Sequence, residues 1–207
     1  MEKINNTVKI YIQILSFIVI WGLVVYVVHP PLTTDLRIVL EQIPKAISIY
    51  AILGIVFTKW IWRWKFLQGW LIKIPDLQGT WDGELKSDWI NPETGKEVDP
   101  IPMVLVIRQT FSNIKCTLMT KESSSYSTTA SINVASNSDD LYLTYNYTNR
   151  PKATIRDRSA IHDGASILKI IRRPNKCLEG EYWTSRKTRG EMTLNFSSKN
   201  LSEKFLL

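Results

Sequence analysis

The chain is 207 residues long, and its formal net charge is +7 at neutral pH. This length allows a membrane segment and one compact domain of about 130 residues. The basic charge alone would suit a nucleic-acid binder. However, most of the excess cations lie within residues 1–73, beside apolar stretches where they orient helices and contact lipid headgroups. We therefore expect no DNA or RNA partner. Cys116 and Cys177 lie far apart in apolar patterns, so we interpret them as buried side chains and expect no disulfide.

The first apolar stretch runs from Ile10 to Val28 without a charged residue. A helix needs roughly 20 apolar residues to cross the hydrocarbon core of a bilayer, so this stretch predicts a transmembrane helix. It is longer than the apolar part of a signal peptide, and no A-x-A-like cleavage site follows it. We expect His29–Pro31 to end the helix, because proline cannot continue it.

A second and less uniform apolar span extends from Val39 to Ile61. Glu41 and Lys45 lie one helical turn apart and can pair at the membrane interface, while Lys59 can extend its amine towards headgroups. The alternative is an amphipathic helix that lies on the membrane surface. The tryptophans within residues 60–64 favour a spanning helix, since aromatic side chains gather at membrane interfaces.

Basic residues flank the outer ends of both predicted spans. Lys3 and Lys9 precede the first span, and Lys59, Arg63 and Lys65 follow the second. The positive-inside rule therefore places both termini in the cytoplasm. We predict two domains, a two-helix transmembrane anchor over residues 1–73 and a cytosolic ligand-sensing domain over residues 74–207.

From Pro75 onward, short alternating runs are separated by turn residues, and no long helical period interrupts them. This pattern predicts an all-β domain, an up-and-down antiparallel β-barrel of eight strands. A two-sheet sandwich is the main alternative. The expected strands are Gln78–Ser87, Pro102–Thr110, Ile114–Thr120, Tyr126–Ala135, Leu141–Thr148, Ala165–Arg172, Leu178–Ser185 and Glu191–Phe196.

A short motif favours the barrel over the sandwich. The first strand opens with Gly79-Thr80-Trp81, and Arg189 lies near the start of the last strand. This combination resembles the closing corner of lipocalin-like barrels, in which the cation lies over the indole ring. The resemblance would place Arg189 over Trp81, whereas the alternative is a core tryptophan beside a surface arginine.

Alternation of side chains along the strands assigns the inner wall of the barrel. The predicted inward residues of the fifth and seventh runs are Leu141, Leu143, Tyr145, Tyr147, Leu178, Gly180, Tyr182, Thr184 and Arg186. The wall is thus aliphatic at one end and carries aromatic and polar groups at the other, which suits one small ligand. We take Tyr145, Tyr182, Thr184 and Arg186 as candidate ligand-binding residues.

The connection from Asn149 to Asp163 is the longest that we expect between these strands. It includes Arg150, Arg156 and Arg158, which we add to the candidate ligand-binding residues. Arginine binds phosphate through a planar fork of donors, so this segment could be a lid for an anionic ligand. The alternative is a solvated loop, or one that contacts lipid headgroups.

Signals for catalysis are poor. The sequence contains no H-E-x-x-H motif, P-loop or Rossmann glycine pattern, and neither His29 nor His162 has a neighbouring nucleophile. We expect a protein that is not an enzyme and that uses neither a metal nor a cofactor. From the residues alone, a membrane-tethered carrier of a hydrophobic small molecule and a structural anchor for a partner complex both stay open.

The β-rich domain opens with Leu77-Gln78-Gly79-Thr80-Trp81-Asp82-Gly83-Glu84-Leu85, and Gly180-Glu181-Tyr182-Trp183 and Arg189-Gly190-Glu191 follow later. Together with the two predicted helices, these segments resemble the SMODS-associating two-transmembrane, β-strand-rich effectors of bacterial cyclic-oligonucleotide anti-phage signalling systems (CBASS). The resemblance covers the whole chain. It assigns no individual ligand residue.

The resemblance implies an inner-membrane protein whose barrel binds a cyclic dinucleotide made by a partner nucleotidyltransferase. It also implies a homo-oligomer on activation, disruption of membrane lipid by the helices, and death of the infected cell. The residues are compatible with this function, because arginines suit the two phosphates and tyrosines can stack the two bases at about 1–3 kcal/mol each. A lipid carrier would have little use for Arg150, Arg156 and Arg186 near one mouth.

Overall fold

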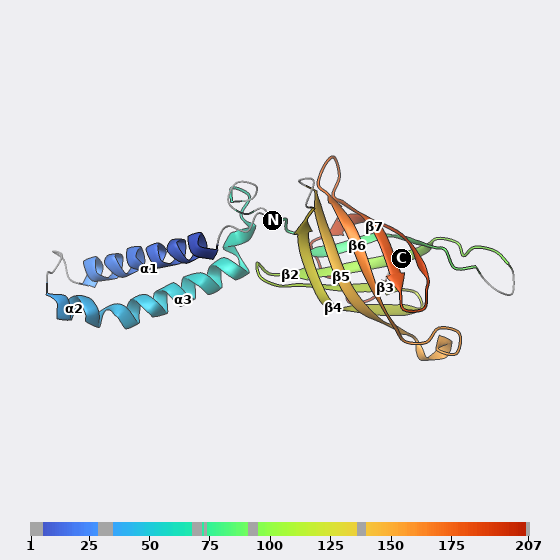
Figure 1. Ribbon diagram of the computed structural model, residues 1–207, viewed down its shortest axis with the longest axis horizontal. Coiled ribbons are helices and arrows are strands. Elements are labelled where there is room, and N and C mark those ends of the chain that lie inside the picture. Colours follow the sequence, from blue (N-terminus) through green and yellow to red (C-terminus); the bar gives the residue numbers. More distant parts are fainter. Residues whose placement is uncertain are drawn as a thin grey trace. The chain divides into compact units, whose positions relative to one another are not determined.

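A computed structural model of the chain shows two compact units, Glu2–Lys73 and Ile74–Leu207, which are described separately (Figure 1). The structure describes residues 6–28, 35–67, 72, 74–90, 95–135 and 140–205.

The first unit is helical. It comprises α1 (Asn6–Val28), α2 (Leu36–Glu41), α3 (Ile43–Lys59) and the short 3-10 helix η1 (Ile61–Arg63). Within the described residues, the segment Leu36–Lys59 is long and apolar enough to cross a membrane, and Gln13–Val28 is a shorter apolar helix. The predicted helix end at His29–Pro31 lies outside the described residues.

The helices α1 and α3 lie side by side (Figure 1). The rings of Phe17 and Tyr50 meet edge to face with centroids 5.8 Å apart, and the Trp21 indole donates a hydrogen bond to the Val39 carbonyl at 3.0 Å. Large apolar side chains of both helices nevertheless remain exposed. They include Ile14, Leu15, Ile18, Val19, Leu23, Val27, Ile47, Ile52, Leu53 and Ile55.

The pair between Glu41 and Lys45 does not form. Glu41 ends α2 and pairs with Arg37 of the same helix at 3.2 Å, while Lys45 donates to the Gln42 side-chain oxygen at 2.8 Å. The reason is the junction at Gln42, which separates α2 from α3 just before Pro44. The two charges therefore do not follow one another along a continuous helix.

The second unit is a closed antiparallel barrel in which the strands follow chain order (Figure 1). The strands are β1 (Gly79–Ser87), β2 (Ile101–Gln109), β3 (Ile114–Thr120), β4 (Ser123–Val134), β5 (Leu141–Pro151), β6 (His162–Ile171), β7 (Cys177–Thr184) and β8 (Arg189–Ser198). Pairing of β1 with β8 closes the barrel. The eight-stranded antiparallel barrel is thus confirmed, and the two-sheet sandwich is excluded.

Most strand ends differ from the predicted ones by a few residues. Both β5 and β6 extend further than predicted towards the connection between them, and they pair as far as Asn149 opposite His162. The connection between them is therefore shorter than the predicted Asn149–Asp163. It covers residues 152–161 and contains the 3-10 helix η2 (Ala153–Ile155).

Apolar side chains fill the barrel interior. The core residues are Leu77, Trp81, Met103, Leu105, Ile107, Cys116, Leu118, Leu141, Leu143, Tyr145, Tyr147, Leu168, Ile170, Leu178, Tyr182, Met192 and Leu194. Burial raises the pKa of Cys116 to about 12, so this thiol is inert and acts as a small core side chain. The cysteines are free, as expected.

Arg189 does not stack on Trp81. Trp81 is 1% exposed, donates to the Leu77 carbonyl at 3.0 Å and meets Phe196 edge to face at 5.2 Å. Because β1 and β8 are antiparallel, the start of β8 lies beside the end of β1, far from Trp81. There Arg189 binds Asp88 at 3.1 Å instead.

Candidate ligand-binding end of the barrel

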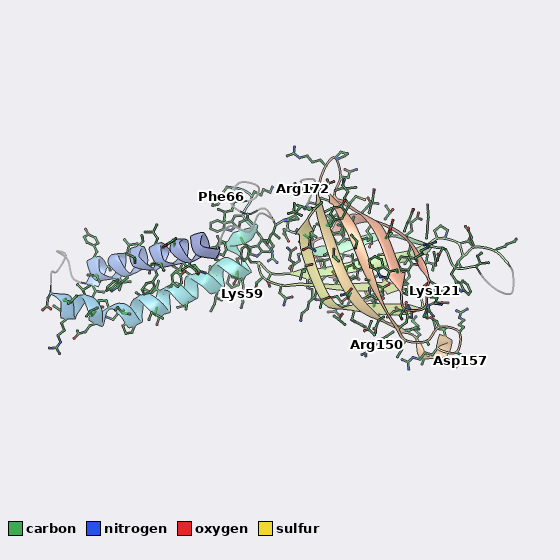
Figure 2. The ribbon with its side chains drawn as sticks, viewed as in Figure 1. Lys59, Phe66, Lys121, Arg150, Asp157 and Arg172 are labelled. Atoms are coloured by element: carbon green, nitrogen blue, oxygen red, sulfur yellow. The ribbon has the colours of Figure 1, made fainter. Side chains whose placement is uncertain are left out.

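Four connections meet at one end of the barrel because the strands are antiparallel. They are the β1–β2 connection after Ser87, the β3–β4 turn Lys121–Glu122, the β5–β6 loop Lys152–Ile161 and the β7–β8 turn Ser185–Thr188. We call this the arginine end. Figure 2 shows Lys121, Arg150 and Asp157 here and Arg172 at the opposite end.

Arg186 lies in the β7–β8 turn. Alternation predicted Arg186 on the inner wall, and this prediction is wrong. Strand β7 ends at Thr184, and Arg186 belongs to the turn that follows. The Arg186 guanidinium donates to the Ser159 hydroxyl at 3.1 Å, which joins the turn to the β5–β6 loop. Thr184, half-buried at the end of β7, shares a hydrogen bond of 2.7 Å with the Thr188 hydroxyl. Arg186 and Thr184 thus belong to one small polar structure at the rim.

Two tyrosines line the interior at this end. A Cβ atom on Gly164 would lie 2.5 Å from Tyr147 Cζ, and one on Gly190 would lie 2.8 Å from Tyr182 Cε1. Both rings therefore occupy space that a larger residue on the neighbouring strand would fill. Burial raises the pKa of Tyr147 and of Tyr182. A hydrogen bond with the Ser87 side chain opposes the shift in Tyr182, and the charge of Arg186 opposes it in both to a smaller extent. The phenols are neutral hydrogen-bond donors at physiological pH, close enough to Arg186 to feel its charge.

Tyr145 lies deeper in the interior. It is 2% exposed, and its ring centroid is 5.8 Å from that of Tyr147. Burial raises the pKa of this phenol above its ordinary value, and an interaction with the Ser166 hydroxyl opposes the shift. The geometry of that interaction is too poor for a full hydrogen bond, and the Tyr145 hydroxyl meets no other partner among the described residues. Tyr145 therefore holds a weakly used donor below the tyrosines of the rim.

The β5–β6 loop is fastened to the β3–β4 turn. Arg158 forms an ion pair with the Glu122 carboxylate, and the backbone N–H of Lys152 donates to the Glu122 carbonyl at 2.8 Å. Arg156 donates to the Pro151 carbonyl at 3.3 Å. Arg156 and Arg158 are both exposed, so each keeps donors that face solvent.

Arg150 occupies a different surface. Its neighbours Asn149 and Pro151 are buried, so alternation places Arg150 on the outer face of β5. It lines a surface hollow of about 330 Å³ whose described lining also includes Tyr126, Ser127, Thr128 and Thr148. Arg150 therefore shares the arginine end with Arg186 but not its inner rim.

Sequence reasoning missed Ser159 and His162 at this end. His162 begins β6, and its Nδ1 atom lies 2.9 Å from the Ala160 carbonyl oxygen. Burial lowers the pKa of this imidazole, with a further contribution from Arg186. Extending the inward alternation back from Ser166 through Gly164 would have identified His162, whereas Ser159 enters only through the fold of the loop. Among the described residues, no group of His, Cys, Asp or Glu side chains is suited to hold a metal ion.

The fold and the candidate site together define a class of protein. Apolar helices precede an eight-stranded barrel, and one end of the barrel has a cationic rim above tyrosines. The family model of the Cap15 cyclic dinucleotide receptor domain matches residues 72–195. The chain belongs to this family of CBASS-associated receptors, and the resemblance to CBASS effectors is confirmed at the level of the family.

Proteins named CD-NTase-associated protein 15 are similar over most of the chain. The protein of Staphylococcus schleiferi is 29% identical over 156 residues, which cover 75% of this chain and 79% of that protein. The protein of Yersinia aleksiciae is 33% identical over 151 residues, covering 71% and 67% of the two chains. The protein of Escherichia albertii is 27% identical over 150 residues, covering 72% and 73%.

Proposed function

We propose that this protein is a membrane-anchored CBASS effector activated by a cyclic dinucleotide. A partner nucleotidyltransferase supplies the nucleotide during phage infection, and the barrel binds it at the arginine end. Binding drives self-assembly, and the N-terminal helices then disrupt the inner membrane and kill the infected cell. Family membership supports the receptor role, while the site, the assembly and the membrane step are our proposals.

The observation that carries the proposal is the position of Arg186. Its guanidinium is held at the rim by Ser159, and its charge acts on Tyr147 and Tyr182 below. A cyclic dinucleotide presents phosphates beside flat bases. A guanidinium at the rim and aromatic rings beneath it match both parts, through charge-assisted hydrogen bonds and stacking respectively.

The other candidate residues take graded roles in this proposal. Arg156 and Arg158 bind phosphate from the loop, and Arg158 exchanges its ion pair with Glu122 when it does so. Thr184 and Tyr182 contact the ligand from the end of β7. Tyr145 forms the floor and offers its weakly used hydroxyl only to a ligand that enters the interior. Arg150, on the outer face, contributes mainly through its charge at a distance.

The helical unit serves as the membrane anchor in this proposal, with residues 74–207 as the sensing domain. The exposed apolar side chains of α1 and α3 are the surface that lipid tails would cover. In this proposal both termini lie in the cytoplasm, where a nucleotide made by a cytoplasmic enzyme is found, and the basic residues that flank the two predicted spans support this orientation.

A lipocalin-like carrier of a hydrophobic molecule is the weaker candidate. Such a carrier needs interior space for an acyl chain, whereas the middle of this barrel is filled by side chains of zero exposure, among them Met103, Leu143 and Leu194. A fatty acid would have to displace well-packed aliphatic groups, and the arginines at the rim could bind only its carboxylate, not its acyl chain.

Calorimetry of the full-length protein in detergent micelles tests the binding step. The titrants are a panel of 3′,3′-cyclic dinucleotides covering all pairs of the common ribonucleotides, with palmitate as the comparison ligand. We expect one or more of the dinucleotides to bind and palmitate to give no heat. Saturable palmitate binding, with no heat of binding from any nucleotide of the panel, would support the carrier and refute our proposal.

A further inference from the structure

Strand β4 extends well beyond its neighbour β3. It pairs with β5 from Ser123 to Val134, but with β3 only over Ser124–Tyr126. The Ser127 hydroxyl accepts one more hydrogen bond, from the Cys116 N–H at 2.9 Å. Across the described part of the chain, no strand or bridge pairs with residues 128–134 on the side away from β5. The closed barrel thus has an open strand edge along residues 128–134.

The backbone groups on this edge follow from the ladder with β5. The Ala135 N–H donates to the Asp140 carbonyl at 2.9 Å, so hydrogen bonds join this pair. Hydrogen-bonded and non-hydrogen-bonded pairs alternate along an antiparallel ladder. Val134, Ile132 and Ala130 consequently direct their N–H and C=O groups away from β5, towards the open edge.

The edge has a bulge between Ser127 and Thr129 at its start, but the residues beyond the bulge lack the other usual protection against pairing with another strand. Natural proteins cover exposed edges or place lysine, proline or charged side chains on them. Residues 128–135 read Thr-Thr-Ala-Ser-Ile-Asn-Val-Ala, with no charge and no proline. The outward side chains of the neighbouring strand β5 beside this segment, Tyr142, Thr144 and Asn146, are also uncharged. The apolar residues of the edge are half-buried and pack against the core, so they keep the strand in its extended form.

We propose that this edge pairs with the same edge of a second copy of the chain. The two β4 strands run antiparallel about a two-fold axis at Ser131. Ala130 then lies opposite Ile132 of the partner copy, and these are the residues whose backbone groups point outward. The proposal rests on the self-assembly in the proposed function, and it names the surface on which two copies meet.

A second copy fits this edge better than a foreign peptide does. Antiparallel pairing of one segment with itself is isologous. Each hydrogen bond from one copy to the other is therefore repeated by symmetry in the reverse direction. No like charges face each other across the axis, since the segment carries none. A charged foreign strand would find no complementary charge here.

Cysteine cross-linking tests the contact directly in membranes that contain the full-length protein. The centre of the proposed pair is non-hydrogen-bonded, with a Cα–Cα distance of about 4.5 Å, which a disulfide can bridge. We expect Ser131→Cys to form a dimer rapidly on mild oxidation once a nucleotide of the panel that binds the protein is added, and more slowly without it. The matched control is Thr193→Cys, exposed on the outer face of β8 between two paired neighbours, which should stay monomeric.

Charge substitution at the same position gives a second and independent readout. Ser131→Lys and Ser131→Glu should each reduce self-association several-fold, since like charges then face each other on the axis. Differently tagged copies of the two variants should co-purify, whereas two copies of one variant should not. Recovery in the mixture also shows that both variants are folded.

Blue-native electrophoresis of the unsubstituted chain separates this proposal from the one on which it rests. If that chain assembles with a nucleotide of the panel while Ser131→Cys does not cross-link and the charge variants assemble normally, the β4 edge is refuted and self-assembly stands. If Ser131→Cys cross-links but no nucleotide increases assembly, the edge is supported and the nucleotide trigger is refuted. If the chain stays monomeric and Ser131→Cys does not cross-link, both proposals fail.

Discussion

At the scale of single residues, the candidate arginines differ in what they already bind. Arg186 donates to a neutral hydroxyl, Arg158 is engaged by a carboxylate, and Arg150 lies on the outer face of β5. A neutral partner is exchanged for phosphate at little cost, whereas a carboxylate must be separated first. These differences rank the residues for binding, although sequence alone placed them in one group.

The first prediction concerns this ranking. Arg186→Ala should weaken binding of the best cyclic dinucleotide by one to two decades, because a lost charge-assisted hydrogen bond costs about 1.5–3 kcal/mol. Arg150→Ala is the matched control and should change affinity by no more than about threefold, as expected of an exposed charge at a distance. Calorimetry on the full-length variants measures both. Equal losses in the two variants would move the site to the outer face of β5.

The second prediction concerns Tyr145. Its buried hydroxyl makes at most a weak hydrogen bond, with Ser166, so Tyr145→Phe should change the melting temperature by no more than a few degrees at pH 7. Tyr145→Ala should lower the melting temperature sharply, because it empties core volume at about 3–5 kcal/mol. Thermal melts followed by circular dichroism test both variants. A clear loss of stability in Tyr145→Phe would mean that this hydrogen bond is strong.

Alkaline pH should separate these variants further. Burial raises the pKa of Tyr145 above its unfolded value of 10.0. Below that pH, Tyr145 therefore makes its full contribution to the free energy of unfolding. Above it the unfolded chain releases a proton that the folded chain keeps, and stability falls as pH rises. The melting temperature of the unsubstituted chain should therefore fall more steeply above pH 10 than that of Tyr145→Phe. Parallel slopes would contradict this assignment.

At the scale of elements, the barrel depends on interior glycines as well as on the apolar strands. A Cβ atom on Gly190 would lie 1.9 Å from the Lys86 carbonyl oxygen and 2.8 Å from Tyr182 Cε1. The third prediction is that Gly190→Ala destabilises the barrel by about 1–3 kcal/mol or more, since backbone must move. Gly54→Ala in α3, where a Cβ meets nothing within 4 Å, should leave the barrel melting transition unchanged. Similar melting of both variants would show that β8 adapts easily.

Strand identity could be predicted from sequence because alternation and turn residues are local signals. The boundaries of β3 agree with the predicted run Ile114–Thr120, and both predicted faces of β5 are correct. Pairing register is not local, so the position of Arg189 relative to Trp81 could not be read from a motif. The partners of Arg158 and Arg186 come from other loops for the same reason.

The inner rim shows where alternation stops giving information. Counting in twos from Tyr182 to Thr184 is correct, but the next step to Arg186 crosses the end of β7 into a turn, where strand geometry no longer applies. Similarly, the open edge of β4 could not be anticipated, because it depends on how far β3 extends beside it. Both features are set by strand length and pairing together.

At the scale of the whole molecule, the sequence gives an expectation of orientation. Cations flank the outer ends of the two predicted spans, which predicts cytoplasmic termini. The fourth prediction is that a cytoplasm-dependent reporter fused after Leu207 is active in bacterial cells and a periplasm-dependent reporter is inactive. The opposite pattern would place the barrel outside the cytoplasm, away from a nucleotide made there.

The last prediction concerns the output of the two units together. If the helices disrupt the membrane, cells that express the full-length chain should depolarise when a binding cyclic dinucleotide is produced in them, as measured with a voltage-sensitive dye. Ile18→Asp places a charge on an exposed apolar position in the middle of α1, at a cost of about 2.5–3.5 kcal/mol for insertion. This variant should lose depolarisation and keep nucleotide binding, while Ile18→Leu should retain both. Depolarisation by an Ile18→Asp protein shown to be absent from the membrane fraction would mean that the helices only tether the barrel, and that killing has another origin.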